Sequence, residues 1–281
     1  MNNGPSVIIV SWNVKAKLKR CLESLLTEPI QQIIVVDNNS ADGSVAMVHQ
    51  EYPQVKLLAL TENIGFAAAN NLAARDTVGD LVFLNPDTYL EPEFFQTLDK
   101  FWYSHSQAGV VGGRIVYDDG KVQRSIRRFP TFWSSLLDTI RLLGRFPQLA
   151  KKYLQPKFDY TKAQAVDQIM GACFAVKRKV WDELGGFDEN FFVWFEEVDF
   201  CKRIKRAGFE VWYNPELHLS HTQGASFYQL SYFKRYCLFM HSLLYYLKKH
   251  HAAWERILIW CISRPVYIIV FLLDYVIPRR T

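Results

Sequence analysis

The sequence predicts an α/β fold with a doubly wound, mostly parallel sheet that carries helices on both faces. In the first half of the chain, short apolar runs alternate four times with segments of helical periodicity, and this alternation is typical of parallel strands joined by helices. The runs are nearly continuous, as at 7–10, which indicates strands covered on both faces. With 49% hydrophobic residues among 281, the chain can bury the core that this fold needs.

The expected elements follow one another in a regular order. The first helix has apolar residues at helical spacing, and the fourth opens with Pro92 in its first turn, where proline is favoured. Strands are expected at 7–11, 33–37, 55–60, 81–85 and 110–117, and helices at 15–26, 42–51, 66–75 and from about residue 91.

Beyond residue 117 the pattern changes. A basic amphipathic segment at 131–155 is expected to form one or two helices, with a break near Gly144 and Pro147. The end of the chain is helical, basic and aromatic. We therefore expect an α/β domain over 1–229, with halves at 1–115 and 116–229, followed by a helical extension over 230–281.

The positive charge lies mainly in two segments. Residues 121–162 hold ten Lys or Arg against two acids, and residues 232–281 hold eight against two, although the formal net charge of the whole chain is only +5. Basic segments on an otherwise acidic protein indicate a surface that meets phosphates. Anionic lipid is favoured over nucleic acid as the source of these phosphates, because the basic segments are also aromatic and apolar.

The five cysteines indicate the compartment. They are scattered and odd in number, and no two have Cys-x-x-Cys spacing, so neither a zinc ribbon nor a disulfide framework is supported. Reduced thiols are typical of the cytosol. The first residues lack a basic stretch followed by an apolar one, so we expect no signal peptide and a cytoplasmic location.

Polar residues close three of the expected strands, at 11–13, 37–40 and 85–87. Open parallel sheets bind ligands beyond the carboxyl ends of their strands, so these clusters should gather at one edge. Asp37 and Asp87 supply the hard oxygen ligands that Mg²⁺ or Mn²⁺ prefers. The alternative is that both aspartates serve only as turn or helix-cap residues. P-loop and dinucleotide-binding glycine motifs are absent from the sequence.

Five motifs follow one another between residues 6 and 229. They are 35–44 (VVDNNSADGS), 63–66 (NIGF) with Asn70 and Asn71, 84–87 (LNPD), 171–173 (GAC) with 185–189 (GGFDE), and 196–203 (EEVDFCKR). Together they resemble the family-two glycosyltransferases of the GT-A fold, and within them the rhamnosyltransferase-like branch. The resemblance implies a nucleotide-binding half at 1–115 and an acceptor half at 116–229.

The resemblance also implies roles for particular residues at the nucleotide end. Asp37 would contact the pyrimidine of a UDP- or dTDP-sugar. Asp87 would bind the metal, Mn²⁺ or Mg²⁺, as the single carboxylate of the motif, with His221 as the second ligand; taken alone, a histidine in this position is more often an ordinary buried or capping residue. The residues that would shape the nucleotide pocket are Trp12, Asn13, Asn63, Gly65 and Asn85.

Glu197 stands where the family places its general base, which takes the proton of the acceptor hydroxyl during an inverting displacement. The pair here is Glu196-Glu197 rather than Glu-Asp, so Asp199 becomes a competing candidate. The alternative for all three acids is that they favour a helix N-terminus, and Asp199 could pair with Arg203 four residues on.

The C-terminal segment 257–277 is apolar enough to raise the question of a membrane span. Ser263, Arg264 and Pro265 interrupt it, and the longest unbroken run is far shorter than the roughly 20 residues of a span. We therefore expect helices that lie on an anionic membrane surface, at the inner face of the cell membrane. The alternative is a packed helical hairpin or a homodimer interface.

Three classes of function compete as explanations of these features. An active glycosyltransferase, acting on a glycan or lipid-linked acceptor in cell-surface polysaccharide synthesis, accounts for all five motifs and for the basic tail. A nucleotidyltransferase would be expected to carry a glycine-rich basic loop after the first strand, and residues 12–15 (WNVK) are not one. A catalytically inactive glycan-binding or scaffold subunit is the remaining alternative, which the Glu-Glu pair favours slightly.

Overall fold

The computed structural model describes residues 4–222 and 229–276, and the side chains up to residue 274. Within these residues a mixed sheet runs in the order β3-β2-β1-β4-β8-β6-β9-β5, and β7 pairs with the N-terminal part of β9. The strands are β1 (Ser6–Ser11), β2 (Gln32–Asp37), β3 (Lys56–Ala59), β4 (Leu81–Leu84), β5 (Thr88–Leu90), β6 (Ala108–Val116), β7 (Gln164–Val166), β8 (Cys173–Val176) and β9 (Glu210–His221).

The N-terminal half is the predicted parallel sheet. β1 lies between β2 and β4, and β3 lies beyond β2, all in parallel. Ser11 pairs with Asp37 at the carboxyl ends of β1 and β2, so the polar residues that follow these strands meet at one edge. All six residues of β1 are buried, as expected for a strand with helices on both sides.

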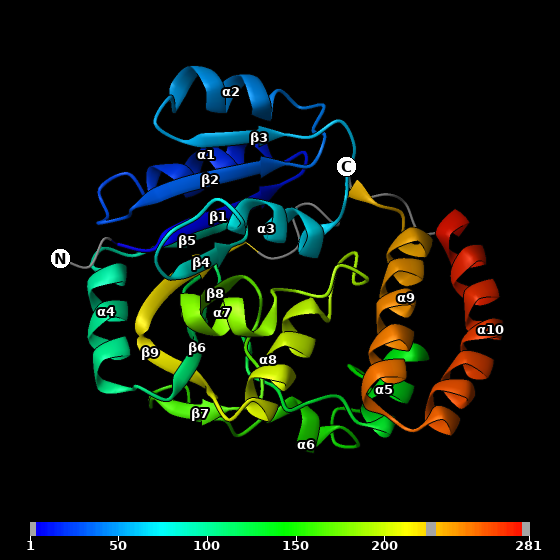
Figure 1. Ribbon diagram of the computed structural model, residues 1–281. Helices are drawn as coiled ribbons and strands as arrows, with labels where there is room; N and C mark the ends of the chain where they lie inside the picture. The colour runs from blue at the N-terminus through cyan, green and yellow to red at the C-terminus, as the bar shows by residue number, and fades with distance from the viewer. Residues whose placement is uncertain (1–3, 223–228, 277–281) are drawn as a thin grey trace.

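Helices cover both faces of the sheet (Figure 1). Apolar residues of α1, α2 and α4 pack on one face and those of α3, α7 and α8 on the other. The doubly wound prediction is therefore confirmed. The helices are α1 (Lys15–Glu23), α2 (Ser44–Glu51), α3 (Phe66–Ala74), α4 (Phe94–Ser104), α5 (Phe132–Thr139), α6 (Lys151–Leu154), α7 (Arg178–Leu184), α8 (Glu196–Arg206), α9 (Tyr232–His250) and α10 (Ala253–Val276).

Four of the described strands, β5, β7, β8 and β9, were not predicted. β5 begins directly after Asp87 and pairs antiparallel with the end of β9, where Thr88 lies opposite His221. Its three residues are too short to show a period of two. This pairing brings the end of the 84–87 motif beside a residue 134 positions later in the sequence.

The C-terminal extension forms an antiparallel pair of helices, α9 and α10, at one side of the molecule (Figure 1). Their packed residues, with those of α5 and the 191–198 segment, make a third apolar core. α10 continues through Pro265 as one helix, although Ser263, Arg264 and Pro265 interrupt its apolar sequence. Ser263 Oγ and Arg264 Nε both donate to the Trp260 carbonyl, in the turn that precedes Pro265.

Candidate active site

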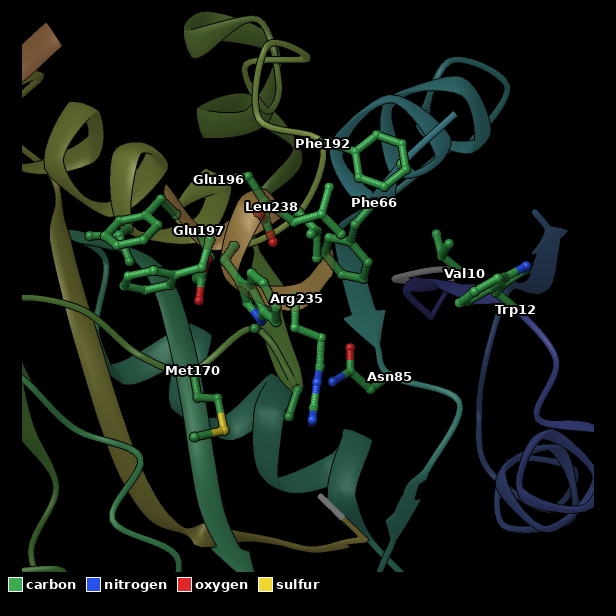
Figure 2. A pocket seen from close by; sticks show the side chains of 18 of the residues that line it. Val10, Trp12, Phe66, Asn85, Met170, Phe192, Glu196, Glu197, Arg235 and Leu238 are labelled. Atoms are coloured by element: carbon green, nitrogen blue, oxygen red, sulfur yellow. The ribbon is translucent and has the colours of Figure 1, made fainter. Parts of the chain in front are cut away.

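A cavity of about 940 Å³ opens at the carboxyl edge of β1 and β4. Residues 168–172 and 192–198 and the first two turns of α9 form its other walls. Figure 2 shows Glu196 and Glu197 at one end and Trp12 at the other, with Arg235 and Asn85 between them. The volume is in the range of small-molecule sites in proteins, which is about 300–1,000 Å³.

The predicted nucleotide residues gather around the Trp12 end. Trp12, Asn63, Gly65, Asn85 and Asp87 line the cavity directly. The side chains that follow β1 and β2 also hold one another: the Asn13 N–H donates to Ser40 Oγ at 2.8 Å, and Asn13 Oδ1 accepts from the Ala41 N–H at 2.7 Å. Asn13 thus supports the pocket from behind its lining.

Asp37 is buried beneath this end of the cavity and is not part of its lining. Its Oδ1 accepts a hydrogen bond from the Ser40 N–H at 2.7 Å, whereas its Oδ2 has no hydrogen-bond partner among the described residues. A buried oxygen of this kind is costly unless a ligand or water satisfies it. Asp37 does not reach the cavity in this structure, and its contact with a nucleotide stays a prediction.

Gly65 is required by two features of its position. Its φ of +89° lies in the left-handed region, and a Cβ there would come within 2.5 Å of the Phe192 carbonyl oxygen. The Phe66 N–H donates to the same oxygen at 2.7 Å. This close approach joins the 63–66 motif to the 185–195 loop and so sets the width of the cavity.

That loop is held from several sides. Arg203 donates to the carbonyls of Leu184 and Gly186 at 2.8 and 2.7 Å. The Asn71 amide donates to the Phe187 carbonyl at 2.8 Å and accepts from its N–H at 3.0 Å. The GGFDE motif therefore acts as scaffold, since its contacts position the residues from 192 onward that line the cavity.

The structure brings the two predicted metal ligands together. His221 Nε2 lies 3.3 Å from Asp87 Oδ1, and both residues are buried. The Gln123 amide donates to the His221 carbonyl at 2.6 Å, and its Oε1 lies 3.1 Å from His221 Nδ1. Gln123 Oε1 thus faces Nδ1 as an acceptor, and with a proton on Nδ1 the Nε2 atom can serve as a metal ligand beside the carboxylate.

Two electron-pair donors so close together suit a cation. In an octahedral site with bonds of about 2.1 Å, neighbouring ligand atoms lie about 3 Å apart. Among the described residues no cluster of three or more His, Cys, Asp or Glu could hold a metal without help. The donor pair therefore fits a metal that takes its other ligands from the substrate, as Mg²⁺ and Mn²⁺ do.

Glu196 and Glu197 begin α8 and both line the cavity. Burial raises the pKa of Glu196 well above its usual range, and the Glu197 charge raises it further. Burial also raises the pKa of Glu197, but backbone N–H groups and the Arg127 charge act to lower it. Two buried carboxylates side by side resist ionising together, so we place the first proton on Glu196 and the negative charge on Glu197.

Asp199 lies outside the cavity. Its side chain is fully buried and pairs with Arg203 at 2.8 Å, Lys249 at 2.7 Å and His250 at 2.7 Å. Burial acts to raise its pKa, yet the hydrogen bonds from His250 and Lys249 and the Arg203 charge hold that pKa below its usual range. Asp199 thus joins α8 to α9, and the structure separates it from the reacting groups.

Residues 6–185 match glycosyl transferase family 2. The chain belongs to this family. It is 30% identical over 237 residues to an N-acetylglucosaminyl-diphospho-decaprenol L-rhamnosyltransferase of Mycobacterium tuberculosis, over 78% of this chain and 76% of the relative. Rhamnosyltransferase WbbL of Escherichia coli is 25% identical over 240 residues, which are 80% of this chain and 87% of the relative.

Solved structures confirm the GT-A fold. A mannosyltransferase from Pyrobaculum calidifontis, in complex with GDP-Man and Mn²⁺, superposes with a TM-score of 0.59 at 17% identity, over 96% of this chain and 73% of the other. GalNAc-T7 with UDP, GalNAc and Mn²⁺ gives 0.58 at 18% identity, over 78% of this chain and 43% of the other. At such identities the likeness concerns the fold alone.

Several residues that line the cavity of this glycosyltransferase were not predicted from the sequence to belong to the site. Arg127 and Tyr153 come from the basic 121–162 segment, and Arg127 Nη1 donates to the Tyr153 hydroxyl at 3.4 Å. Phe233, Lys234 and Arg235 come from the start of α9. In both segments the sequence shows basic residues beside aromatic ones, and this pattern was interpreted as a membrane-binding surface. The position of α9 against the cavity shows that some of these residues also line the site.

Proposed function

We propose that the protein transfers a sugar, with inversion, from a UDP- or dTDP-sugar to a lipid-linked or glycan acceptor. The observation that carries this proposal is that one cavity holds a carboxylate–imidazole pair, Asp87 and His221, and a pair of buried carboxylates, Glu196 and Glu197. The first pair suits the diphosphate of the donor through a metal, and the second suits an acceptor hydroxyl.

Asp87 and His221 would hold Mn²⁺ or Mg²⁺. When bound, the ion supplies positive charge to the diphosphate as its bond to the sugar breaks. Gln123 keeps the His221 ring in the orientation that presents Nε2. An imidazole ligand suits Mn²⁺ better than Mg²⁺, since Mg²⁺ prefers oxygen.

Glu197 acts as the general base. Its carboxylate takes the proton from the acceptor hydroxyl while that oxygen forms a bond to the anomeric carbon. The bond from this carbon to the diphosphate oxygen breaks on the opposite side, so its electron pair leaves with the nucleotide and the configuration inverts. Burial raises the pKa of Glu197, which makes it a stronger base, and Glu196 beside it holds the first proton of the pair.

The relatives support the choice of substrates. One is named for transfer of L-rhamnose to an N-acetylglucosaminyl-diphospho-decaprenol and another as a rhamnosyltransferase. We therefore propose rhamnose as the sugar and cell-surface polysaccharide synthesis as the process. The presence of both carboxylates and of the Asp87–His221 pair favours an active enzyme over an inactive glycan-binding subunit.

The test is a donor screen with the intact protein, repeated with Asp87→Ala and Glu197→Gln. We expect Mn²⁺-dependent binding and turnover of one or more UDP- or dTDP-sugars. Glu197→Gln should bind the nucleotide as tightly as wild type and lose turnover by about 10²–10⁴-fold, whereas Asp87→Ala should lose metal-dependent binding. Glu183→Gln, which changes an exposed acid of α7, is the matched control. Full turnover by Glu197→Gln would rule out its role as base.

We further propose that the enzyme is cytoplasmic and peripheral on an anionic membrane. α10 is the one helix among the described residues that is long and apolar enough to cross a membrane. Arg264 lies near the middle of this helix, and because a charge at mid-span is costly we favour a helix that lies in the interface. The outer face of α10 exposes the large apolar side chains of Trp254, Ile257, Trp260, Ile268, Ile269 and Leu272. Trp133 of α5 is exposed as well.

A further inference from the structure

The wall that α9 contributes to the cavity is apolar and continues to the outside of the molecule. Phe233 lines the cavity, and its ring packs edge-on against Phe271 of α10 with the ring centres 5.2 Å apart. Phe271 is 44% exposed and lies beside Leu272, which is 59% exposed. Phe233 therefore belongs both to the cavity wall and to the apolar contact with the partly exposed Phe271 of α10.

Cationic side chains stand where this wall meets the polar part of the cavity. Of the described lining residues, Arg127, Lys234 and Arg235 carry positive charge. Arg127 contacts Tyr153 and acts on Glu197, and Lys234 is exposed. Arg235 is half-buried, follows Phe233 by two residues, and has its guanidinium carbon 5.8 Å from the centre of the Tyr232 ring. In Figure 2 it lies between Glu197 and Asn85, in the middle of the cavity.

We propose that Phe233 and Arg235 form the binding site for the lipid-phosphate part of the acceptor. The planar guanidinium of Arg235 binds phosphate oxygens, for which its paired N–H groups are suited. Phe233 directs the attached apolar chain along Phe271 to the face of α10. The inference deepens the proposed function, since it takes the acceptor to be lipid-linked and names the residues that recognise it.

This arrangement has a chemical consequence. The phosphate and the chain leave the cavity toward α9 and α10, so the sugar on the other side of the phosphate points toward Glu197. The C-terminal extension then selects the acceptor as well as contacting the membrane. A soluble sugar without a lipid phosphate lacks both contacts and should be a poorer acceptor.

Direct binding tests the proposal without relying on turnover. Farnesyl monophosphate is titrated into the full-length protein by calorimetry, once without nucleotide and once with saturating UDP and Mn²⁺, and farnesol serves as the probe without phosphate. We expect Arg235→Gln to weaken farnesyl monophosphate binding at least tenfold and to leave farnesol unchanged. Phe233→Ser should weaken both probes, and Arg235→Lys should restore part of the phosphate contact. Lys248→Gln, an exposed cation on the same helix, should bind like wild type.

Three results would overturn the proposal: no farnesyl monophosphate binding by wild type, equal binding by Arg235→Gln, or displacement of the probe by UDP with Mn²⁺. The last result would assign the phosphate contact of Arg235 to the donor. Failure of the proposed function would look different, because wild type would then show no Mn²⁺-dependent binding of any nucleotide. Circular dichroism of each variant separates loss of binding from loss of fold.

Discussion

His221 Nε2 lies 3.3 Å from Asp87 Oδ1 because β5 and β9 pair antiparallel, with Thr88 opposite His221. The Thr222 N–H also donates to the Asp87 carbonyl at 3.0 Å, which fixes the backbone on both sides of the pair. A shift of this register by one residue would turn the imidazole to the other face of the sheet. The close approach of Asp87 and His221 therefore depends on the register of β5, which is only three residues long.

Gln123 should control the affinity of the metal. Its amide holds the His221 ring from behind, by contacts at 2.6 Å to the carbonyl and 3.1 Å to Nδ1. Loss of such a supporting contact typically lowers metal affinity by about 10–100-fold. We therefore expect Gln123→Leu to raise the Mn²⁺ concentration that gives half-maximal activity by about 10–100-fold, as measured by metal titration. Gln148→Leu, in the 140–150 stretch outside the cavity, is the control, and an unchanged Mn²⁺ requirement in Gln123→Leu would argue against the metal assignment.

Arg127 should influence the pH at which Glu197 becomes protonated and can no longer act as the base. Activity falls as pH drops through the raised pKa of Glu197, since the protonated acid cannot accept a proton. The Arg127 charge favours ionised Glu197 and so lowers its pKa. Removing that charge in Arg127→Gln raises the pKa, and the acid limb of the kcat/KM profile should move to higher pH. Arg128→Gln, an exposed neighbour, should leave the limb in place; movement of the limb to lower pH in Arg127→Gln would contradict the assignment.

The sequence allowed the donor side of the site to be predicted because its residues follow strands. Asn85 and Asp87 come directly after β4, and the edge at which parallel strands end is known from topology alone. Arg127 and Arg235 could not be predicted in this way. Arg127 lies in an irregular segment and Arg235 on a helix whose position depends on packing between distant parts of the chain, such as Ser242 Oγ donating to the Val193 carbonyl.

Asp199 should matter for stability rather than for chemistry. It is fully buried and pairs with Arg203, Lys249 and His250, and breaking a buried ion pair costs about 3–5 kcal/mol. We expect Asp199→Asn to lower the free energy of unfolding by an amount in that range, measured by urea denaturation at pH 7. Asp182→Asn breaks an exposed Arg–Asp pair of the same spacing and should cost less than about 1 kcal/mol.

The pH dependence of this difference gives a second check. The folded-state pKa of Asp199 is lowered, so its contribution to stability is present above the unfolded value of about 3.9. It is lost as pH falls through the folded-state pKa. The gap in stability between wild type and Asp199→Asn should therefore shrink in acid, and a gap that widens below pH 4 would contradict the pairing.

Gly65→Ala should disturb the cavity more than an ordinary glycine substitution. A Cβ at this position would meet the Phe192 carbonyl at 2.5 Å, which forces the 63–66 motif and the 185–195 loop apart. Gly208 has a similar φ, +86°, but open space around its Cβ position, so Gly208→Ala measures the backbone strain alone, about 1–2 kcal/mol. Gly65→Ala should lower the melting temperature further and weaken nucleotide binding, as measured by thermal shift with UDP. Equal behaviour of the two variants would show that the contact with Phe192 is unimportant.

The outer face of α10 should decide whether the enzyme binds membranes. Ile269 and Leu272 are 55% and 59% exposed and make no part of the buried core. Changing both to aspartate removes apolar surface from the interface and adds negative charge next to anionic headgroups, so we expect loss of flotation with phosphatidylglycerol vesicles. Leu26 is 45% exposed on the other side of the sheet, and Leu26→Asp should float like wild type. Wild-type protein that stays with the vesicles after a carbonate wash would indicate insertion rather than surface binding. A change from dimer to monomer in the double variant, by light scattering without lipid, would instead assign this face to a homodimer.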